Sequence, residues 1–232
     1  MSTNKRFFPV IHCVSPFAQN GLNGIGHALA NVRIAKENGA DGVFLIGHDL
    51  PSSDLICIYE QARKQHPDFY IGVNFLDIEA SNTKALGEAL KRCPGVNALW
   101  MDGIPRGRIT NNTEIEYFAG VAFKYRDPNP GIPEIKRQCR ATLESNSHIV
   151  TSGSVTGSAP KRMKIKVIRD YAGPERRIAI ASGISAENVD RFLDIANDFL
   201  VASSISKRNL QHLADYLVPE KVDELARMIH TG

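Results

Sequence analysis

Short apolar runs alternate along the chain with segments whose apolar residues recur at helical spacing. The runs are typical of buried β-strands, because they are rich in Val, Ile and Phe and end at small or polar residues. Eight of them are predicted strands: Phe8–Cys13, Gly42–Ile46, Tyr70–Phe75, Ala98–Met101, Phe118–Phe123, His148–Ser152, Ile178–Ala181 and Phe199–Ala202. The predicted helices are Gly24–Asn38, Ser53–Gln65, Ser81–Arg92, Pro133–Ser145, Pro160–Tyr171, Ala186–Ile195 and Asn209–His230, the last broken at Pro219.

This alternation of strands and helices predicts a parallel sheet covered by helices. Eight such units in 232 residues fit a closed barrel, which usually needs about 250 residues. We therefore predict one α/β domain over residues 1–232, a single (β/α)8 TIM barrel. The fourth helix is expected to be abbreviated or missing, because the segment between Asp102 and Tyr117 is polar and rich in Gly and Asn.

The last two predicted strands end in small polar turns. Ser182-Gly183 follows the first of them, and Ser203-Ser204 follows the second. In barrels of this kind the loops after the last two strands bind phosphate through backbone N–H groups. The two turns thus indicate a phosphate site, although ordinary strand–helix turns have a similar composition. Ser185 is predicted to cap the helix between these strands.

Composition narrows the class of protein. The formal net charge of +3 is too small, and the basic residues too scattered, to indicate a nucleic-acid surface. No apolar run approaches the roughly 20 residues of a membrane span. The four cysteines lie far apart, which favours reduced thiols over disulfides or a zinc site. We expect a cytoplasmic protein without membrane insertion, and leave homo-oligomerisation open.

Catalytic groups in such barrels project from the carboxyl ends of the strands. Lys124 follows a strand, and a lysine there is costly to bury unless it binds an anion or reacts. Strand alternation places it in the barrel interior and Phe123 on the helix side. Asp102 and His12 are candidate proton carriers, and Asn74 is a candidate ligand for a substrate hydroxyl. A solvent-reaching lysine, a loop-capping aspartate and a core histidine are the structural alternatives.

The loop Thr151–Pro160 is long and rich in hydroxyl groups. Ser152, Gly153 and Thr156 are its candidate ligand-binding residues, since hydroxyls and backbone amides suit an anionic or polyhydroxylated ligand. They complete the predicted binding set with Asn74 and the two turns. That set is Asn74, Ser152, Gly153, Thr156, Ser182, Gly183, Ser203 and Ser204.

Two motifs carry a resemblance to a known family. Ser152-Gly153, Thr156-Gly157 and Pro160 match an SG-x-x-TG-x-x-P pattern, and Ser182–Val189 matches SG-[VI]-x-x-ENV. With these motifs the chain resembles the BtpA/SgcQ family, whose members are TIM-barrel proteins. One branch of that family is named for photosystem I biogenesis, another belongs to sugar-metabolism gene sets, and the family has no settled reaction. Its pattern has an Asp and a His where this chain has Gly120 and Tyr125.

These observations support three functional hypotheses. The first is an aldolase- or isomerase-type enzyme that binds a small phosphorylated metabolite, such as a sugar phosphate, and uses Lys124, Asp102 and His12. The second is a non-catalytic biogenesis or regulatory factor that uses the barrel as a binding scaffold, which the altered acid/base complement would suit. The third is a phosphoribosyl-handling enzyme. No cofactor is expected, and no ligand spacing supports a metal.

Overall fold

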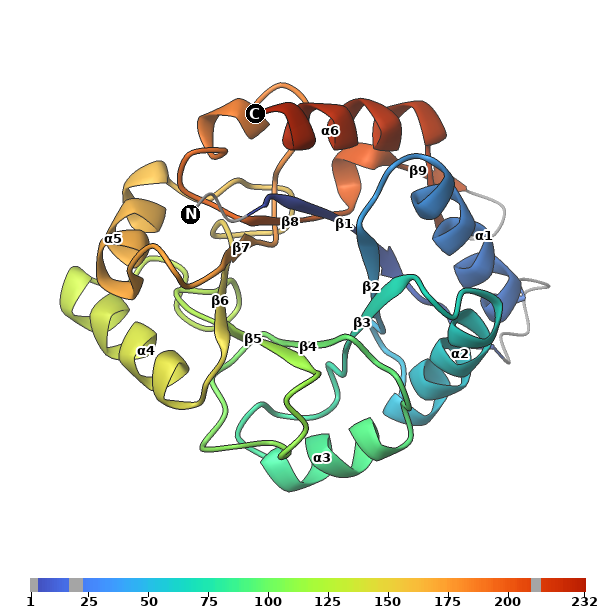
Figure 1. The fold of residues 1–232 in the computed structure, drawn as a ribbon, viewed down its shortest axis with the longest axis horizontal. Coiled ribbons are helices and arrows are strands. Elements are labelled where there is room, and N and C mark those ends of the chain that lie inside the picture. Colours follow the sequence, from blue (N-terminus) through green and yellow to red (C-terminus); the bar gives the residue numbers. More distant parts are fainter. Residues whose placement is uncertain (1–3, 17–22, 210–213) are drawn as a thin grey trace.

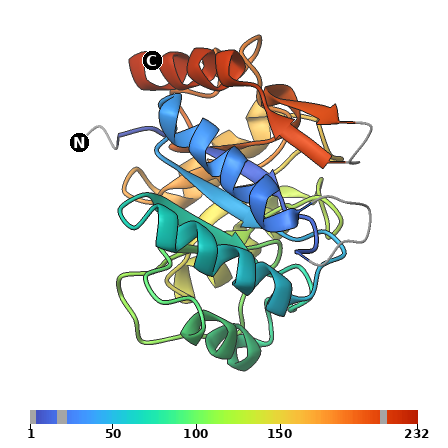
Figure 2. The same cartoon turned by 90° about the vertical axis from the view of Figure 1, so that its right-hand side faces the viewer.

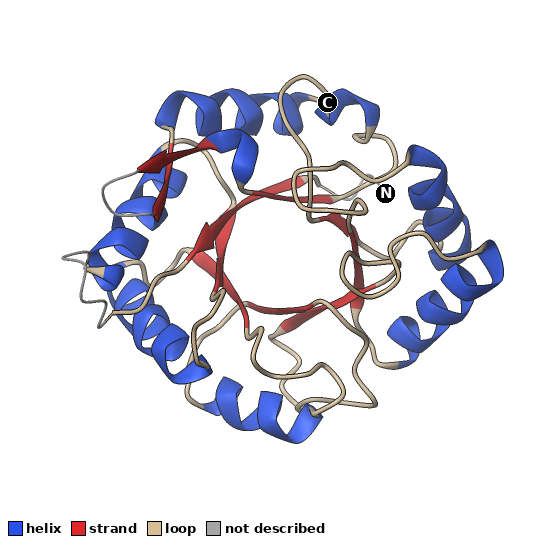
Figure 3. Cartoon of the chain, turned by 180° about the vertical axis from the view of Figure 1, so that it is seen from behind, coloured by secondary structure: helices blue, strands red, loops and turns tan. Residues whose placement is uncertain are grey.

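The computed structural model describes residues 4–16, 23–209 and 214–232. Eight parallel strands form a closed barrel in sequence order, and β8 pairs with β1 to complete the ring (Figures 1 and 3). The strands are β1 (Arg6–His12), β2 (Gly42–Ile46), β3 (Tyr70–Asn74), β4 (Ala98–Met101), β5 (Glu116–Gly120), β6 (His148–Thr151), β7 (Ile178–Ile180) and β8 (Asp198–Val201). This architecture confirms the predicted TIM barrel.

Helices surround the barrel on its outside (Figure 1). They are α1 (Gly24–Glu37), α2 (Ser52–Gln65), α3 (Thr83–Lys91), α4 (Ile132–Glu144), α5 (Arg162–Ala172) and α6 (Pro219–Thr231). Their ends follow local chemistry: the Asn23 side chain accepts a hydrogen bond from the Gly26 N–H at 3.0 Å, and a proline opens α6. Between β4 and β5 the chain forms no helix, which confirms that the fourth helix is missing.

Two predicted helices differ in the structure. Within Ala186–Ile195 only a 3-10 turn, Val189–Arg191, forms. The Asn188 side chain explains this, because it accepts from the Ser185 N–H at 3.1 Å and donates to the Gly183 carbonyl at 2.8 Å. These bonds hold the segment in a compact turn instead of a helix.

The predicted helix Asn209–His230 is wrong in its first half. An antiparallel hairpin, β9 (Ser206–Asn209) with β10 (Ala214–Leu217), precedes α6, and residues 210–213 lie outside the described residues. Pro219 therefore begins a helix rather than breaking one, as a residue without a backbone N–H readily does. Figure 2 shows the hairpin at the end of the barrel opposite the start of β1.

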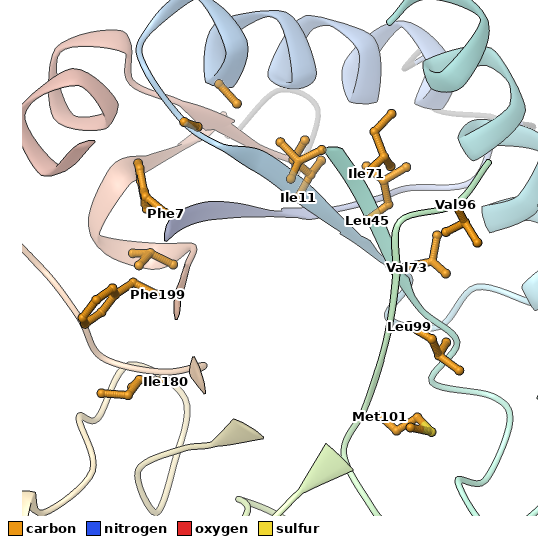
Figure 4. Close-up of a cluster of buried hydrophobic side chains, with 14 of the residues drawn as sticks. Phe7, Ile11, Leu45, Ile71, Val73, Val96, Leu99, Met101, Ile180 and Phe199 are labelled. Carbon is orange, nitrogen blue, oxygen red and sulfur yellow. The ribbon is translucent and has the colours of Figure 1, made fainter. Parts of the chain in front are cut away.

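Strand alternation separates two apolar layers. Residues such as Ile11, Leu45 and Val73 point outwards and pack under the helices (Figure 4). The barrel interior holds a second cluster that contains Phe8, Phe44, Ala98, Trp100, Phe118, Val150, Ala179 and Leu200. Burial of both layers is the main source of stability in a fold of this kind.

Phe123 lies on the other side from the one that alternation predicts. Strand β5 ends at Gly120, and Ala122 takes a left-handed conformation with a φ of 47°. The turn breaks the period of two, so that Phe123 joins the interior cluster with its ring centre 6.1 Å from that of Trp100. The same turn places Lys124.

The amino ends of the strands are joined inside the barrel by charged side chains. Asp198 is fully buried and accepts from Arg6 at 2.8 Å and from Arg177 at 2.6 Å. Arg6 also reaches Glu116 at 2.9 Å, and Tyr70 donates its hydroxyl proton to the same carboxylate. Paired charges thus occupy this end, which leaves the opposite end for a binding site.

Candidate functional site

A cavity of about 360 Å³ opens at the carboxyl ends of the strands. Its rim is polar and consists of residues that follow β6, β7 and β8, whereas the barrel interior contributes an apolar floor. The rim residues are Thr156, Gly157, Ser182, Gly183, Ser185, Asn188, Ser203 and Ser204, and the floor residues are Val10, Trp100, Ala181 and Leu200. His12 and Lys124 also line the cavity.

Backbone N–H groups at the rim are free to bind an anion. Those of Gly183, Ser203 and Ser204 have no acceptor among the described residues. The neighbouring hydroxyls are engaged within the protein: Ser182 donates to the Val155 carbonyl at 3.2 Å, and Ser204 to the Ile184 carbonyl at 2.6 Å. The arrangement can therefore bind a phosphate mainly through backbone amides, with hydroxyls keeping the loops in place.

The glycines of the two family motifs allow these loops to pack. A Cβ atom on Gly153 would lie 1.9 Å from the Ser158 carbonyl oxygen. One on Gly183, whose φ is 64°, would lie 2.1 Å from the Ala159 nitrogen. No side chain fits at either position. Gly153 is needed for the close approach within the loop after β6, and Gly183 for the contact between that loop and the loop after β7. Ser152 and Gly153 do not line the cavity, and their contacts are structural.

Lys124 lies where the interior of the barrel meets the loops. Its backbone N–H donates to Ser152 Oγ at 2.8 Å, and its ammonium is 3.5 Å from Thr156 Oγ1. The ammonium also lies 5.7 Å from the centre of the Tyr125 ring, whose hydroxyl bonds Thr156 at 2.7 Å. It forms no ion pair among the described residues, so it can meet an anionic or electrophilic ligand.

A second lysine, Lys164 on α5, holds the backbone on either side of Lys124 by hydrogen bonds. It is buried, and its ammonium donates to the carbonyls of Ala122 at 2.9 Å, Pro128 at 3.1 Å and Ser152. Burial lowers the pKa of Lys164 to about 8. Because it ties both segments that hold Lys124 to one helix, it restricts the position of the Lys124 backbone.

His12, at the end of β1, lines the cavity with a neutral imidazole. Burial and then the neighbouring imidazole of His48, 5.1 Å away between ring centres, lower the pKa of His12 to about 4. It is therefore neutral at pH 7. On its other side a space of about 20 Å³ separates it from Asp215 of β10, large enough for one water molecule.

Asn74 and Asp102 lie in a neighbouring cavity of about 220 Å³, of which Lys124 forms one wall. The Asn74 amide donates to Asp102 Oδ1 at 3.2 Å. Burial raises the pKa of Asp102, although the Asn74 amide and the charge of Lys124 oppose that effect. Lys124 thus belongs to both cavities, with His12 on one side and Asp102 on the other.

The predicted site residues therefore separate into three groups. Lys124, His12 and the residues after β7 and β8 share the large cavity, together with Thr156. Asn74 and Asp102 share the smaller one, and Ser152 and Gly153 support the loops. Trp100, Asn188 and Asp215 were not proposed as site residues from the sequence. The alternation of side chains along β4 puts Trp100 on the interior face and could have indicated that it lines the cavity. Asp215, by contrast, lay in a segment that was predicted to be helical.

Gly120, at the end of β5, lies against the segment that follows β4. A Cβ atom there would lie 2.2 Å from the Asp102 carbonyl oxygen, so β4 and β5 approach too closely for a side chain. Among the residues that the structure describes, no cluster of His, Cys, Asp or Glu could hold a metal ion. Within the same part of the chain, no helix has the length and apolar character to cross a bilayer.

The fold and the open carboxyl-terminal cavity define a small-molecule-binding TIM barrel. A family model described as the BtpA family matches residues 94–231, and the chain belongs to that family. None of the curated proteins matches the chain in sequence.

Solved structures that resemble the chain are distant in sequence. Phosphoribosylanthranilate isomerase from Thermotoga maritima, solved as a monomer generated from the dimer, has a TM-score of 0.61 at 13% identity, covering 98% of this chain and all 100% of its own. A protein from Aquifex aeolicus VF5 has 0.60 at 14%, covering 98% and 91%. A protein of the dihydrodipicolinate synthase family from Coccidioides immitis has 0.59 at 12%, covering 86% and 67%. At these identities the likeness shows the fold alone.

Proposed function

We propose that this protein is an enzyme that binds a small phosphorylated carbonyl compound, of the sugar-phosphate class, and cleaves or isomerises it. One observation carries the proposal: the cavity places Lys124 and the neutral His12 beside the free N–H groups of Gly183, Ser203 and Ser204. An amine, a base and an anion site in one cavity are the groups that such a reaction needs.

The chemistry follows from these groups. The phosphate binds the three N–H groups, which directs the carbonyl carbon towards the Lys124 amine. The neutral amine adds to the carbonyl to give a carbinolamine. Asp102 then protonates the carbinolamine hydroxyl, which leaves as water, and an iminium ion remains. In cleavage, the electrons of the carbon–carbon bond move into the iminium while His12 accepts the proton of the hydroxyl on the departing fragment. In isomerisation, His12 takes a proton from the neighbouring carbon. Asp102, with its raised pKa, can return a proton from the other side.

Borohydride trapping tests the covalent step. We expect incubation with dihydroxyacetone phosphate and borohydride to attach the ligand to Lys124, detected by mass spectrometry of the digested protein. Lys124→Arg keeps the charge and removes the reactive amine, so its trapped yield should fall at least a hundredfold. Equal labelling of the variant, or labelling at surface lysines only, would remove Lys124 from the mechanism.

The phosphate end has a separate test. Ser203→Asp places a carboxylate at the rim and should weaken the binding of inorganic phosphate about tenfold or more in calorimetry, by charge repulsion. Ser53→Asp, at an exposed position of α2, is the matched control and should bind as the wild type does. Identical affinities in the two variants would contradict a phosphate at this rim.

A second candidate is a phosphoribosyl-handling isomerase. The likeness in fold to phosphoribosylanthranilate isomerase suggests this hypothesis, and the apolar floor of the cavity, which includes Trp100, could accept an aromatic group. Tight binding of an N-aryl phosphoribosyl compound, without any borohydride trapping, would favour this isomerase.

A non-catalytic scaffold is the remaining hypothesis. It would be favoured if the protein bound phosphorylated ligands and converted none of them.

A further inference from the structure

The smaller cavity at the carboxyl ends of the strands lies on the far side of Lys124 from the phosphate rim. Residues at the ends of β3 and β4, and in the segments that follow β3, β4 and β5, form its wall. One water molecule needs about 10–15 Å³, so a cavity of about 220 Å³ has room for a fragment of several heavy atoms. Under the proposed function this wall supplies only the proton of Asp102.

The Lys124 amine lies between the two cavities. Its nitrogen is 3.5 Å from Thr156 Oγ1, on the wall of the large cavity, and 5.7 Å from the centre of the Tyr125 ring, on the wall of the smaller one. Burial raises the pKa of Asp102 and the charge of Lys124 opposes that effect, so the amine also lies near this carboxyl group. A carbonyl carbon joined to the amine therefore has a cavity on each side.

Asn74, at the end of β3, has a side-chain acceptor that no described residue uses. Its amide N–H donates to Asp102 Oδ1 at 3.2 Å, which fixes the orientation of the amide and leaves Asn74 Oδ1 without a hydrogen bond. That oxygen keeps accessible surface, because it is not one of the fully buried side-chain atoms that have no partner, and the smaller cavity is the one that Asn74 lines. A hydroxyl group in this cavity can donate to it.

The charged groups of the wall favour an uncharged fragment. Arg126 already pairs with Glu79 at 2.8 Å. Lys124 is joined to the carbonyl carbon under the proposed function. Asp102 bonds a hydroxyl group in either protonation state, as a donor or as an acceptor, but repels a second phosphate when it is ionised.

We propose that the smaller cavity is a second subsite, which binds an uncharged, hydroxylated chain of the substrate through Asn74 and Asp102. This inference rests on the proposed function for the phosphate and the amine, and it adds the substrate class: a phosphorylated carbonyl compound whose chain carries hydroxyl groups beyond the bond that breaks. The hydroxyl group at that bond stays beside His12, and the next one donates to Asn74 Oδ1. Of the two proposed reactions the subsite selects cleavage, because only cleavage leaves a separate fragment.

The reverse reaction tests the subsite, because it uses the two fragments as separate reagents. His12 takes a proton from the carbon next to the iminium ion on Lys124, and the resulting enamine carbon attacks the carbon of an added aldehyde. The carbonyl electron pair moves to the aldehyde oxygen, which takes the proton back from His12, and water then releases the product from the amine.

Three aldehydes are offered to the wild type with dihydroxyacetone phosphate: glyceraldehyde, propanal and glyceraldehyde 3-phosphate. Mass spectrometry of the joined product gives kcat/KM for each. We expect glyceraldehyde to exceed propanal roughly tenfold or more, because propanal leaves Asn74 Oδ1 unpaired. Glyceraldehyde should also exceed its phosphate, which carries a charge into the subsite.

Asn74→Leu removes both polar atoms and keeps a similar volume. The ratio of kcat/KM for glyceraldehyde to that for propanal should fall at least about fivefold in this variant. Effects on the steps at Lys124 are common to both aldehydes and cancel in the ratio. Asn111→Leu, at an exposed position between β4 and β5, is the matched control and should keep the ratio of the wild type.

The outcomes separate the subsite from the proposed function. The subsite is overturned if the wild type joins no aldehyde, if it does not prefer glyceraldehyde, or if Asn74→Leu keeps the ratio, while borohydride trapping at Lys124 still supports the proposed function. If Asn74→Leu does not fold, the preference of the wild type decides. If dihydroxyacetone phosphate is not trapped at Lys124 of the wild type, the proposed function fails, and the subsite fails with it.

Discussion

The two ends of the barrel treat polar side chains in opposite ways. At the amino ends of the strands, Arg6, Glu116, Asp198 and Arg177 pair with one another and block access. At the carboxyl ends, Lys124 lines a cavity and has no ion pair among the described residues. Buried charges are stable when they are paired, so the unpaired ammonium of Lys124 marks the carboxyl ends as the side that can receive an anionic ligand.

The largest effect is expected from breaking the paired end. Asp198→Asn removes the carboxylate from a fully buried site and leaves Arg6 and Arg177 without their main counter-charge. We expect a loss of about 3–5 kcal/mol in the free energy of unfolding by urea. Asp194→Asn, which breaks an exposed pair with Arg162, is the control and should cost less than about 1 kcal/mol. Equal losses would show that the buried network is not special.

A smaller loss of stability should follow from adding a side chain at Gly120, near the carboxyl ends of the strands. Gly120→Ala places a Cβ atom 2.2 Å from the Asp102 carbonyl oxygen and should destabilise the protein by about 1–3 kcal/mol, measured by urea unfolding. Gly131→Ala is the matched control, since its Cβ would lie 3.7 Å from Pro133 in ordinary contact. If Gly120→Ala proved as stable as this control, the close approach of Gly120 to Asp102 would not require a glycine at this position.

Acid should weaken the two ends in separate pH windows. The pKa of His12 is lowered to about 4, so the unfolded chain binds a proton before the folded one, and stability falls as the pH drops from about 6.5 to 4. Burial alone would raise the pKa of Glu116, but hydrogen bonds from His148 and Arg6 lower it to about 2, so its contribution is lost between about pH 4.5 and 2.

Two variants check this assignment by urea unfolding at a series of pH values. His12→Asn should flatten the slope in the upper window only, and Glu116→Gln should flatten it in the lower window only. Finding that His12→Asn leaves the upper slope unchanged would place its titration elsewhere.

The smallest effect on stability is expected at Lys124. Lys124→Met removes a charge that has no ion pair among the described residues, so the free energy of unfolding should change by no more than about 0.5 kcal/mol. Under the proposed mechanism the same variant loses borohydride trapping. If Lys124→Met instead lost much stability, Lys124 would have a structural role like that of the paired charges at the amino ends of the strands.

Local patterns were sufficient for most of the fold. The eight strands follow from short β-rich runs, and the missing fourth helix follows from a polar segment that could not cover the barrel. The pattern failed where side-chain contacts replaced the local preference. Asn188 holds Ala186–Ile195 in a turn, the segment before Pro219 forms a hairpin, and the left-handed Ala122 reverses the facing of Phe123.

The candidate site was only partly visible in the sequence. Strand ends identified Lys124, His12, Asn74 and Asp102, because in a parallel barrel all of these ends lie on one face. That rule does not tell which of them share a cavity. The division of His12 from Asp102, with Lys124 between them, depends on how the loops after β4 and β5 pack.

The sequence alone thus determined the barrel, the family motifs and, except at Phe123, the inward and outward faces, since these depend on spacing along the chain. Only the tertiary structure decided which polar groups are paired. Ser152 and Gly153 look like ligand residues in the chain and are packing residues in the fold, while Lys124 lines the cavity without an ion pair among the described residues. Pairing depends on contacts between segments distant in sequence, and no local pattern records them.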